Sequence, residues 1–423
     1  MISELKIRNF KSLESVDLKL GHFNLLVGAN ASGKSNFLDA LRFLQGAGNG
    51  LSVDEILDGK PATSTNSRWN GIRGGSQFVA FRQLDGSTAR SVEFVVSIPE
   101  TRLYEVRRTD LQYELQFWPG TNKFWQHIVD ADKRVWHEDE KVRAVLDIAE
   151  NQFPTGLYAS CFNTARAYAN ALKQRHPSLT PQDAESLNNL EPETFNLDPY
   201  SIFVAHVLDA LQDMQFLDPL SEALRKYSSR VTRLGESGEG FAALIHEIES
   251  NGSKPALLEW LKELRPDEVS DLYALSGADN DFMVAIKEGN TEFRAAAISE
   301  GTLRFIALAS AFFQPSMPKV LVIEEIEKGL HPSRLRLLLE LMRSQSKRTG
   351  TQVFATTHSP TLLNWLTEED RKTAFICTRD AESGATKMRP LSEVPRLEEL
   401  IQKNYNLDQL FEEGWLESVL NES

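Results

Sequence analysis

Cysteine is nearly absent from this chain of 423 residues, which contains only Cys161 and Cys377. Two distant cysteines build no disulfide framework and lack the CxxC spacing of a zinc site, so a reducing, cytoplasmic setting is predicted. Long hydrophobic runs are missing too, and without about 18 consecutive apolar residues no membrane-spanning helix is expected. The opening MISELKIRNFKSL alternates polar and apolar residues, which predicts a first strand and not a signal peptide.

Basic residues are fewer than acidic residues in this chain. The chain has 46 Lys and Arg against 60 Asp and Glu, a net charge of -14. Such a molecule as a whole repels nucleic acid, so DNA binding would need a local basic patch or a groove shared by two chains. The acidity is more simply explained by solubility. Long heptad arrays are also lacking, which excludes an extended coiled coil.

A glycine-rich stretch near the N-terminus has the spacing of a phosphate-binding loop, Gly28-x4-Gly33-Lys34-Ser35. The apolar run 23–27 predicts a buried strand before it, and the helical spacing of 36–44 predicts a helix after it. Glycines let consecutive N–H groups surround a phosphate, and the helix N-terminus adds positive potential. Lys34 is expected to reach the β- and γ-phosphates, and the Ser35 hydroxyl to bind Mg²⁺.

A second strand ends in carboxylates. The apolar run 320–323 is typical of a central parallel strand, and Glu324 and Glu325 follow it directly. Ligands of such sheets bind at the carboxyl ends of the strands. Adjacent residues on a strand point to opposite sides, so we assign Glu324 to Mg²⁺ and Glu325 to the attacking water.

The helix expected from Pro332 carries a row of basic residues. These are Arg334, Arg336, Arg343, Lys347 and Arg348. A solvated basic face is the favoured interpretation, and a DNA-contact patch is the alternative.

The stretch TQVFATTHSPTLLNWL repeats the arrangement of strand, polar turn and helix. His358 falls at the carboxyl end of this strand. An imidazole there can hydrogen-bond the γ-phosphate or the attacking water.

The stretch AISEGTLRFIALASAFF begins with a small polar turn and continues as a helix that is apolar on nearly all sides. Ser299 is a good N-cap, and Gly301 allows close approach of another backbone. An apolar helix of this kind must be buried. Its N-terminus is an anion site, yet the phosphate loop already serves the chain's own nucleotide. This second site therefore suits the ATP of a neighbouring subunit.

These motifs together resemble one protein family, the ABC-type, SMC/RecF/OLD-like bacterial ATPases of the "AAA family". The resemblance rests on GANASGKSN at 28–36, ISEGT at 298–302, IEEIEKGLHP at 323–332 and TTHSP at 356–360. It covers about 1–45 and 215–423 well, and 100–210 poorly. The TOPRIM nuclease domain of OLD proteins needs a Glu and an Asp-x-Asp, which the last 65 residues lack, so no nuclease is expected here.

The resemblance implies roles for individual residues. ATP and Mg²⁺ are the implied cofactors. Nucleotide contacts would come from Gly28, Asn30, Gly33, Lys34, Ser35 and Asn36, and from Ser299 and Gly301 of a second subunit. Glu325 would be the catalytic glutamate, His358 the switch histidine, and Glu327 to Leu330 the D-loop at a dimer interface. Glu324 stands where Asp is commoner, and Glu300, where ABC transporters have Gly, should point away from the phosphates.

The fold implied is α/β: a P-loop NTPase head of ABC type, with a mixed parallel sheet, an antiparallel β lobe and a helical insertion. The expected segments are 1–144 for the N-terminal part of the head, 145–275 for the insertion and 276–423 for the C-terminal part. SVEFVVSI and LQYELQFW alternate as strands, and TAFICTR is expected to be the last strand. EKVRAVLDIAENQF, SIFVAHVLDALQDMQFL and GFAALIHEIESN have helical spacing, whereas 175–199 is expected to be a loop.

The function expected from these observations is an ATP-gated switch. Two chains, or a higher homo-oligomer, would sandwich ATP and control a separate effector, a nuclease or toxin, in anti-phage defence or DNA maintenance. One alternative is a RecF-like scaffold that binds DNA when ATP is bound. The other is a stand-alone phosphotransferase, which would act as a monomer and need no Ser299.

Overall fold

The computed structural model describes residues 1–62, 68–103, 107–119, 124–130, 210–229, 231–264, 269–277, 279, 281–403, 405–415 and 418–419. They form two compact units that interleave along the chain. The first unit contains the described parts of 1–21, 29–213 and 376–389, and the second those of 22–28, 214–375 and 390–423. Each unit is therefore assembled from stretches far apart in the chain. The division into two parts of a head, 1–144 and 276–423, and an insertion at 145–275 stays a prediction.

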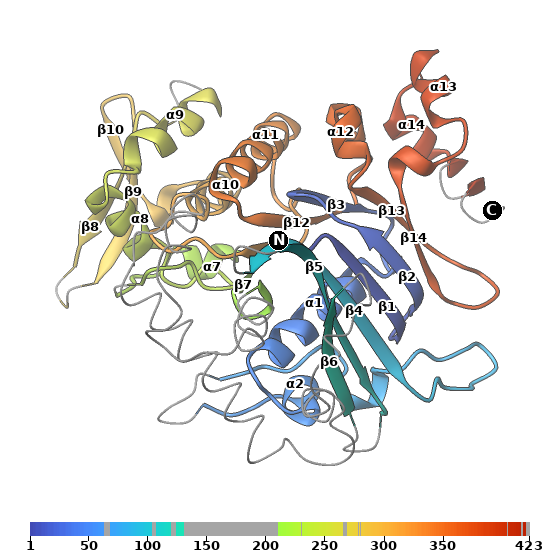
Figure 1. Cartoon of the computed structure of the whole chain (residues 1–423). Coiled ribbons are helices and arrows are strands. Elements are labelled where there is room, and N and C mark those ends of the chain that lie inside the picture. The colour runs from blue at the N-terminus through green and yellow to red at the C-terminus, as the bar shows by residue number, and fades with distance from the viewer. Residues whose placement is uncertain are drawn as a thin grey trace. The chain divides into compact units, whose positions relative to one another are not determined.

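The first unit contains a five-stranded antiparallel sheet in the order β2-β1-β4-β5-β6. Figure 1 shows these strands in blue and teal. Their bounds are β1 Glu4–Phe10, β2 Leu13–Lys19, β4 Val92–Leu103, β5 Arg107–Phe117 and β6 Phe124–Asp130. The alternating patterns at the N-terminus, in SVEFVVSI and in LQYELQFW are thereby confirmed as strands.

Four phenylalanines join this sheet to the helix α1 (Lys34–Gly48). The Phe43 ring of α1 stacks on Phe94 of β4 at 5.1 Å and on Phe117 of β5 at 4.9 Å. Phe10 of β1 meets Phe94 edge to face at 5.3 Å. Each such pair adds roughly 0.5–1.5 kcal/mol beyond the area it buries, so α1 is held firmly on its sheet. The first unit also contains α2 (Val53–Asp58) and the 3₁₀ helix η1 (Ser76–Phe78).

The second unit is built on parallel strands in the order β3-β12-β11-β7. Their bounds are β3 Phe23–Val27, β7 Met214–Leu217, β11 Val320–Ile323 and β12 Gln352–Thr357. Every residue of these strands is buried, as the apolar runs at 23–27 and 320–323 predicted. The helix expected up to residue 217 was wrong at its end. A short apolar run does not distinguish strand from helix, and pairing with β11 makes 214–217 a strand.

A smaller antiparallel sheet and most of the helices complete the second unit. The sheet has the order β10-β9-β8, and Figure 1 shows α8 beside β8 and β9. The bounds are β8 Asp271–Ser276, β9 Phe282–Glu288, β10 Thr291–Arg294, α7 Ser221–Leu224, α8 Phe241–Ser250, α9 Lys254–Leu264, η4 Ala295–Ala297, α10 Glu300–Ser310 and α11 Pro332–Thr349. α10 contacts α7, α8, α9 and α11, which buries it on all sides as its apolar sequence predicted.

The C-terminal part differs from the sequence prediction in one place. The helix expected after β12 is present as a 3₁₀ helix, η5 (Pro360–Trp365). β13 (Ala374–Arg379), however, is not the last strand, because β14 (Thr386–Pro390) follows it. The remaining elements are α12 Glu368–Arg371, η6 Leu391–Glu393, α13 Leu397–Gln402 and α14 Leu407–Glu412.

Two predictions lie outside the described residues, the helix at 140–153 and the loop at 175–199. Within the described ranges, no helix is both long and apolar enough to cross a bilayer.

Candidate active site

The phosphate-binding loop of the first unit adopts backbone conformations that L-residues rarely take. Ala31 has φ 65° and Gly33 has φ 102°. α1 begins at Lys34, no side chain caps it, and its first turn contains no acidic residue. The positive end of the helix dipole is therefore not offset locally by a carboxylate. The loop and its helix have the form expected for a phosphate site.

A buried pair of hydroxyls supports this loop from behind. A Cβ atom added to Gly33 would lie 2.0 Å from Thr386 Oγ1, so only glycine fits against β14. The Thr386 hydroxyl lies 2.7 Å from Ser12 Oγ, and the Asn36 amide donates to the same Ser12 oxygen at 2.6 Å. Asn36, a predicted nucleotide contact, thus has its amide engaged within the chain. Thr386 was missed because its partners are distant in sequence.

Lys34 lies folded against its own loop. Its side chain is buried, and Nζ donates to the Ala29 carbonyl at 2.8 Å and to Ser32 Oγ at 3.4 Å. The loop therefore holds this ammonium group close to its own main chain, where a phosphate would bind. Burial raises the pKa of the neighbouring Cys377 thiol to about 12, although the charge of Lys34 acts against this rise. Cys377 stays a thiol at neutral pH, so it is a core residue and not a nucleophile.

An ionic cluster beside the loop was not predicted. The Lys11 ammonium contacts Asp39 of α1, and Arg73 donates to Asp39 Oδ1 at 3.1 Å and to the Ser35 carbonyl at 2.8 Å. Burial lowers the pKa of Lys11, and the charge of Asp39 opposes that effect. The cluster ties the first turn of α1 to two other segments of the first unit.

In the second unit, the carboxyl ends of neighbouring strands meet at one edge. Val27 of β3 pairs with Thr357 of β12, and Ala355 of β12 pairs with Ile323 of β11. The Gly28 N–H, the first group of the phosphate loop, donates to the Thr357 carbonyl at 3.3 Å. The phosphate loop from Gly28, the turn that contains His358 and the turn that contains Glu324 and Glu325 (the acidic turn) therefore all begin at the same edge of the sheet, as predicted.

The two adjacent glutamates are held by different neighbours. The Glu324 N–H donates to the Leu217 carbonyl of β7 at 3.0 Å, whereas the Glu325 N–H donates to Thr356 Oγ1 of β12 at 2.9 Å. Glu325 has φ 50°, a left-handed conformation that is uncommon for a residue with a side chain. Such strain costs on the order of 1–3 kcal/mol and is concentrated at functional positions. The strained backbone conformation of Glu325 therefore supports a functional role for this residue.

Arg304 of α10 links the turn that contains Glu324 and Glu325 to the helix that begins after Ser299. It is only 2% exposed, and its guanidinium donates to the carbonyls of Glu324 and Glu325 at 3.2 Å and to Asp218 Oδ1 at 3.0 Å. A buried charge needs such partners. An arginine within an otherwise apolar helix was the sequence signal that could have revealed this link.

The turn that contains Ser299 and Gly301 makes hydrogen bonds at the start of its own helix, α10. Ser299 is the N-cap of α10, as predicted, and its hydroxyl accepts from the Thr302 N–H at 3.2 Å. A Cβ atom on Gly301 would lie 2.4 Å from the Gly329 carbonyl, which confirms the predicted close approach of another backbone. Contact of Ser299 and Gly301 with the ATP of another subunit stays a prediction.

His358 contacts Glu327 in the acidic turn. The sequence resemblance assigned Glu327 to the D-loop and predicted no contact with His358. Glu327 Oε1 accepts from the His358 N–H at 2.6 Å and lies 2.7 Å from His358 Nδ1. The histidine is therefore oriented by a carboxylate of its own chain.

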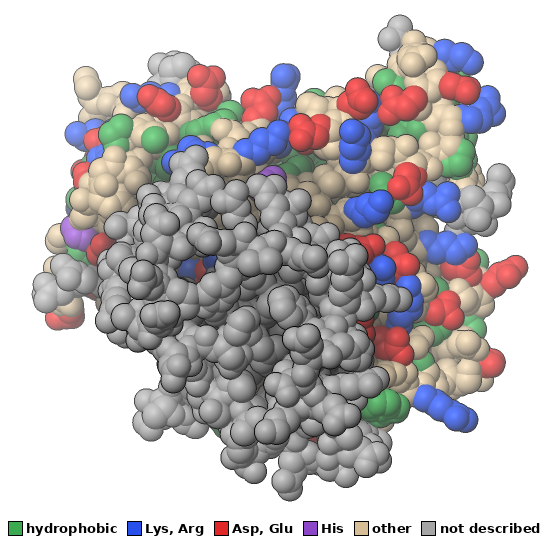
Figure 2. Space-filling view, viewed as in Figure 1, with side chains coloured by type: hydrophobic (Ala, Val, Ile, Leu, Met, Phe, Trp, Pro, Cys, Tyr) green, Lys and Arg blue, Asp and Glu red, His purple; other side chains and the backbone are tan. Residues whose placement is uncertain are grey.

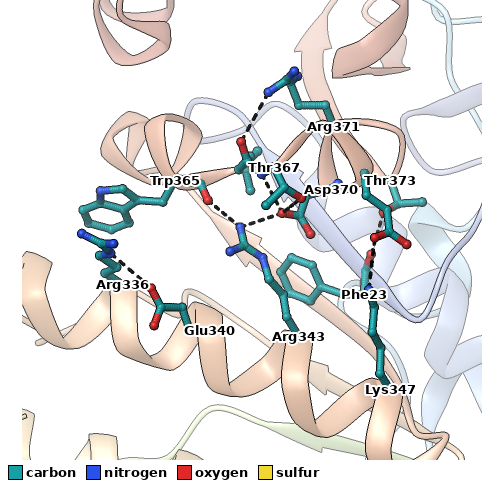
Figure 3. Close-up of polar contacts among 12 residues, drawn as sticks. Phe23, Arg336, Glu340, Arg343, Lys347, Trp365, Thr367, Asp370, Arg371 and Thr373 are labelled. Carbon is teal, nitrogen blue, oxygen red and sulfur yellow. Dashed lines mark hydrogen bonds and ion pairs between the residues drawn. The ribbon is translucent and has the colours of Figure 1, made fainter. Parts of the chain in front are cut away.

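The basic row of α11 is largely paired with carboxylates. Figure 3 shows Arg343 between the Trp365 carbonyl, at 2.6 Å, and Asp370, at 2.7 Å. Arg336 pairs with Glu340, and Lys347 with Glu369. On the face shown in Figure 2, basic and acidic side chains are mixed across the described surface. These pairs support the solvated-face interpretation over a DNA-contact patch.

Ser35 offers a hydroxyl oxygen in the first unit and Glu324 a carboxylate oxygen in the second, and each is a type of ligand that Mg²⁺ accepts. Their joint use by one Mg²⁺ ion stays a prediction. No group of three or more His, Cys, Asp or Glu side chains suited to a metal occurs among the described residues. Mg²⁺ commonly uses one or two protein ligands and takes the others from phosphate and water, so a dedicated cage is not required.

Comparisons with known proteins agree with these features. The model of the family described as "AAA domain, putative AbiEii toxin, Type IV TA system" matches residues 23–364. An "ATP/GTP phosphatase" of Helicobacter pylori is 23% identical over 385 residues, which cover 89% of this chain and 90% of that protein. The DNA replication and repair protein RecF of Pasteurella multocida is 50% identical over 60 residues, which cover 14% of this chain and 16% of RecF.

Among solved structures, the SMC head domain from Thermotoga maritima is similar to this chain with a TM-score of 0.46 and 12% identity. That likeness covers 92% of this chain and 98% of the SMC chain. An SmcHead bound to the C-winged helix domain of ScpA is similar with a TM-score of 0.47 and 16% identity, over 95% of this chain and 99% of the other.

Proposed function

Because this chain belongs to the ATPase family described as AAA domain, putative AbiEii toxin, Type IV TA system, we propose that it acts as an ATP-gated dimeric switch. The observation that carries this proposal is the shared strand edge of the second unit. Gly28, Glu324, Glu325 and His358 all leave that edge, on neighbouring strands in register. A phosphate loop alone would bind a nucleotide. Two carboxylates and an imidazole beside it would add the groups that hydrolysis of the nucleotide requires.

Hydrolysis would start with the phosphate loop, whose main-chain N–H groups and Lys34 hold the triphosphate. The Glu325 carboxylate accepts a proton from a water molecule. The water oxygen forms a bond to the γ-phosphorus while the bond from that phosphorus to the β–γ bridging oxygen breaks. ADP and inorganic phosphate result. Most of the rate enhancement would come from positioning and charge stabilisation.

Mg²⁺, when bound, would neutralise phosphate oxygens, and Ser35 and Glu324 are the residues that would hold it. The His358 imidazole would contact the γ-phosphate end of the nucleotide. Loss of that phosphate would then change what His358 contacts.

The dimer is proposed because, among the described residues, α1 and α10 both begin with a turn suited to phosphate, whereas only the turn before α1 has the phosphate-loop sequence. Each Ser299 turn would complete the ATP site of the other subunit, so ATP closes the dimer and hydrolysis opens it. A ligand of this kind shifts the equilibrium only because it binds the closed state more tightly.

A separate effector is the most indirect part of the proposal. The family description names a putative toxin and a type IV toxin–antitoxin system. That description supports a link of the switch to a toxin. Control of a nuclease, and a role in anti-phage defence or DNA maintenance, are proposed from the sequence resemblance alone.

The decisive experiment is Glu325→Gln, with the mass in solution measured with and without ATP. The amide cannot accept the proton, so ATP persists, and we expect a particle of twice the chain mass of 47.6 kDa. Ser299→Arg in the same background should remain monomeric while still binding ATP. Glu340→Gln, on the exposed face of α11, is a matched Glu-to-Gln control and should behave as wild type.

A monomeric Glu325→Gln with ATP bound would overturn the switch. The same sample distinguishes the alternatives. A RecF-like scaffold would show ATP-dependent DNA binding that weakens steeply with salt, a possibility raised by the RecF relatives. A phosphotransferase would be active as a monomer and insensitive to Ser299→Arg.

A further inference from the structure

Glu327 occupies an unusual position for a surface loop carboxylate. It lies in the turn after β11, and its side chain is only 10% exposed. One oxygen, Oε1, meets both the N–H and the Nδ1 atom of His358, at 2.6 and 2.7 Å. The other oxygen, Oε2, is buried without a hydrogen-bond partner in the part of the chain that the structure describes. Burying a carboxylate oxygen without a hydrogen bond lowers the stability of the fold. The position of Glu327 is therefore better explained by a functional role than by a contribution to stability.

The two contacts to one histidine fix its orientation. The bond to the N–H sets the backbone of the turn, and the contact with Nδ1 sets the rotation of the ring. Exposed ion pairs rarely achieve such a constraint, because their long side chains remain mobile. Oε1 acts as an acceptor here, since it already receives the backbone N–H. At 2.7 Å from this oxygen, Nδ1 is the ring nitrogen placed to give it a proton, and Nε2 is the ring atom directed away from Glu327.

We propose that Glu327 is a positioning residue that holds His358 as the tautomer protonated at Nδ1 and presents Nε2 to the γ-phosphate end of the nucleotide. The logic is that of the carboxylate–histidine pair in serine hydrolases, where the carboxylate fixes the tautomer and orientation of the ring. The role assigned to Nε2 rests on the proposed ATPase mechanism. The tautomer does not, because it is inferred from the contacts between Glu327 and His358 and not from the ATPase mechanism.

The rest of the acidic turn is anchored independently of Glu327. The N–H groups of Glu325 and Ile326 donate to Thr356 at 2.9 and 3.0 Å. Arg304 holds the carbonyls of Glu324 and Glu325, and Lys328 pairs with Asp218 at 3.1 Å. A substitution at Glu327 should therefore release His358 without displacing the glutamates.

The first test is nitrogen NMR of protein labelled at its eight histidines, with the His358 signals identified by their loss in His358→Asn. Without nucleotide, wild-type His358 should be protonated at Nδ1. Glu327→Ala should shift it to the Nε2-protonated form that free imidazole prefers, and Glu327→Gln, which keeps an acceptor oxygen, should preserve the wild-type tautomer. A wild-type His358 protonated only at Nε2 overturns the proposal, whatever any variant does.

The second test is ATP hydrolysis. Glu327→Ala should lower kcat by about 10–100-fold with KM for ATP within about twofold, and Glu327→Gln should recover most of that loss. In a His358→Ala background, Glu327→Ala should cost nothing further, since the two residues act as a unit. Full additivity of the two substitutions would contradict the positioning role. Wild-type hydrolysis that is indifferent to Glu325→Gln would instead contradict the proposed function and leave the NMR result standing.

Discussion

Two helices of this protein begin with a short turn of small residues, and the two turns are built differently. α1 starts after Gly33 with no side-chain cap and no acidic residue in its first turn. α10 starts after Ser299, whose hydroxyl caps the Thr302 N–H, and it carries Glu300 in its first turn. Both begin with a helix N-terminus that favours anions, but only α10 has an acidic residue in its first turn.

The difference indicates that the two helix starts have different roles in phosphate binding. The start of α1 depends on backbone conformation, with a glycine at φ 102° pressed against Thr386, and is suited to hold phosphate by itself. The start of α10 satisfies its own turn and has a negative side chain beside it. On its own it should attract phosphate less than the start of α1 does, which agrees with the proposal that Ser299 meets only the ATP of another subunit.

The largest expected effect comes from Gly33→Ala. An alanine there is strained at positive φ and would bring Cβ within 2.0 Å of Thr386 Oγ1, so the loop must move. We expect ATP affinity, measured by calorimetry, to fall by about 100-fold or more. Gly86→Ala is the matched control, since it shares the positive φ but meets nothing within 4 Å. Wild-type affinity in Gly33→Ala would mean that the loop shape is not what binds phosphate.

An intermediate effect is expected at Ser299. Ser299→Ala removes the cap and should lower the free energy of unfolding by about 1 kcal/mol. Ser299→Asp keeps a good N-cap but adds a negative charge, so it should retain stability yet abolish ATP-dependent dimerisation in the Glu325→Gln background. Chemical denaturation and mass in solution measure the two properties. Normal dimerisation of Ser299→Asp would show that this hydroxyl does not face a phosphate.

The smallest effect is expected for Thr386→Val, which keeps the shape but removes the hydroxyl bonded to Ser12. The loss of one buried hydrogen bond should destabilise the protein by about 1 kcal/mol and weaken ATP binding only a few-fold. Thr378→Val is a matched control on β13, because the buried Thr378 hydroxyl has no partner among the described residues. Equal effects of the two substitutions on unfolding would remove the case for a support behind the loop.

The sequence predicted best where the signal is local. The phosphate loop, the cap of α10 and the strands at 23–27 and 320–323 each depend on a few consecutive residues, and all were confirmed as local structures. The strand at 214–217 was missed because four apolar residues also fit the end of a helix. β14 was missed because its TKMRP sequence has no clear alternation of polar and apolar residues. Its Thr386 contacts Ser12, which lies 374 positions away in the sequence.

The sequence alone determined the chemistry available to this protein: a phosphate loop, two carboxylates and a histidine at strand ends, and a serine turn on a buried helix. Residue type and local spacing are enough for this, because helix, strand and turn preferences act over a few residues. Only the tertiary structure decided what holds these groups in place. Glu327 against His358, Arg304 against the acidic turn and Thr386 against Gly33 join segments whose proximity depends on strand order and packing, which no local pattern encodes.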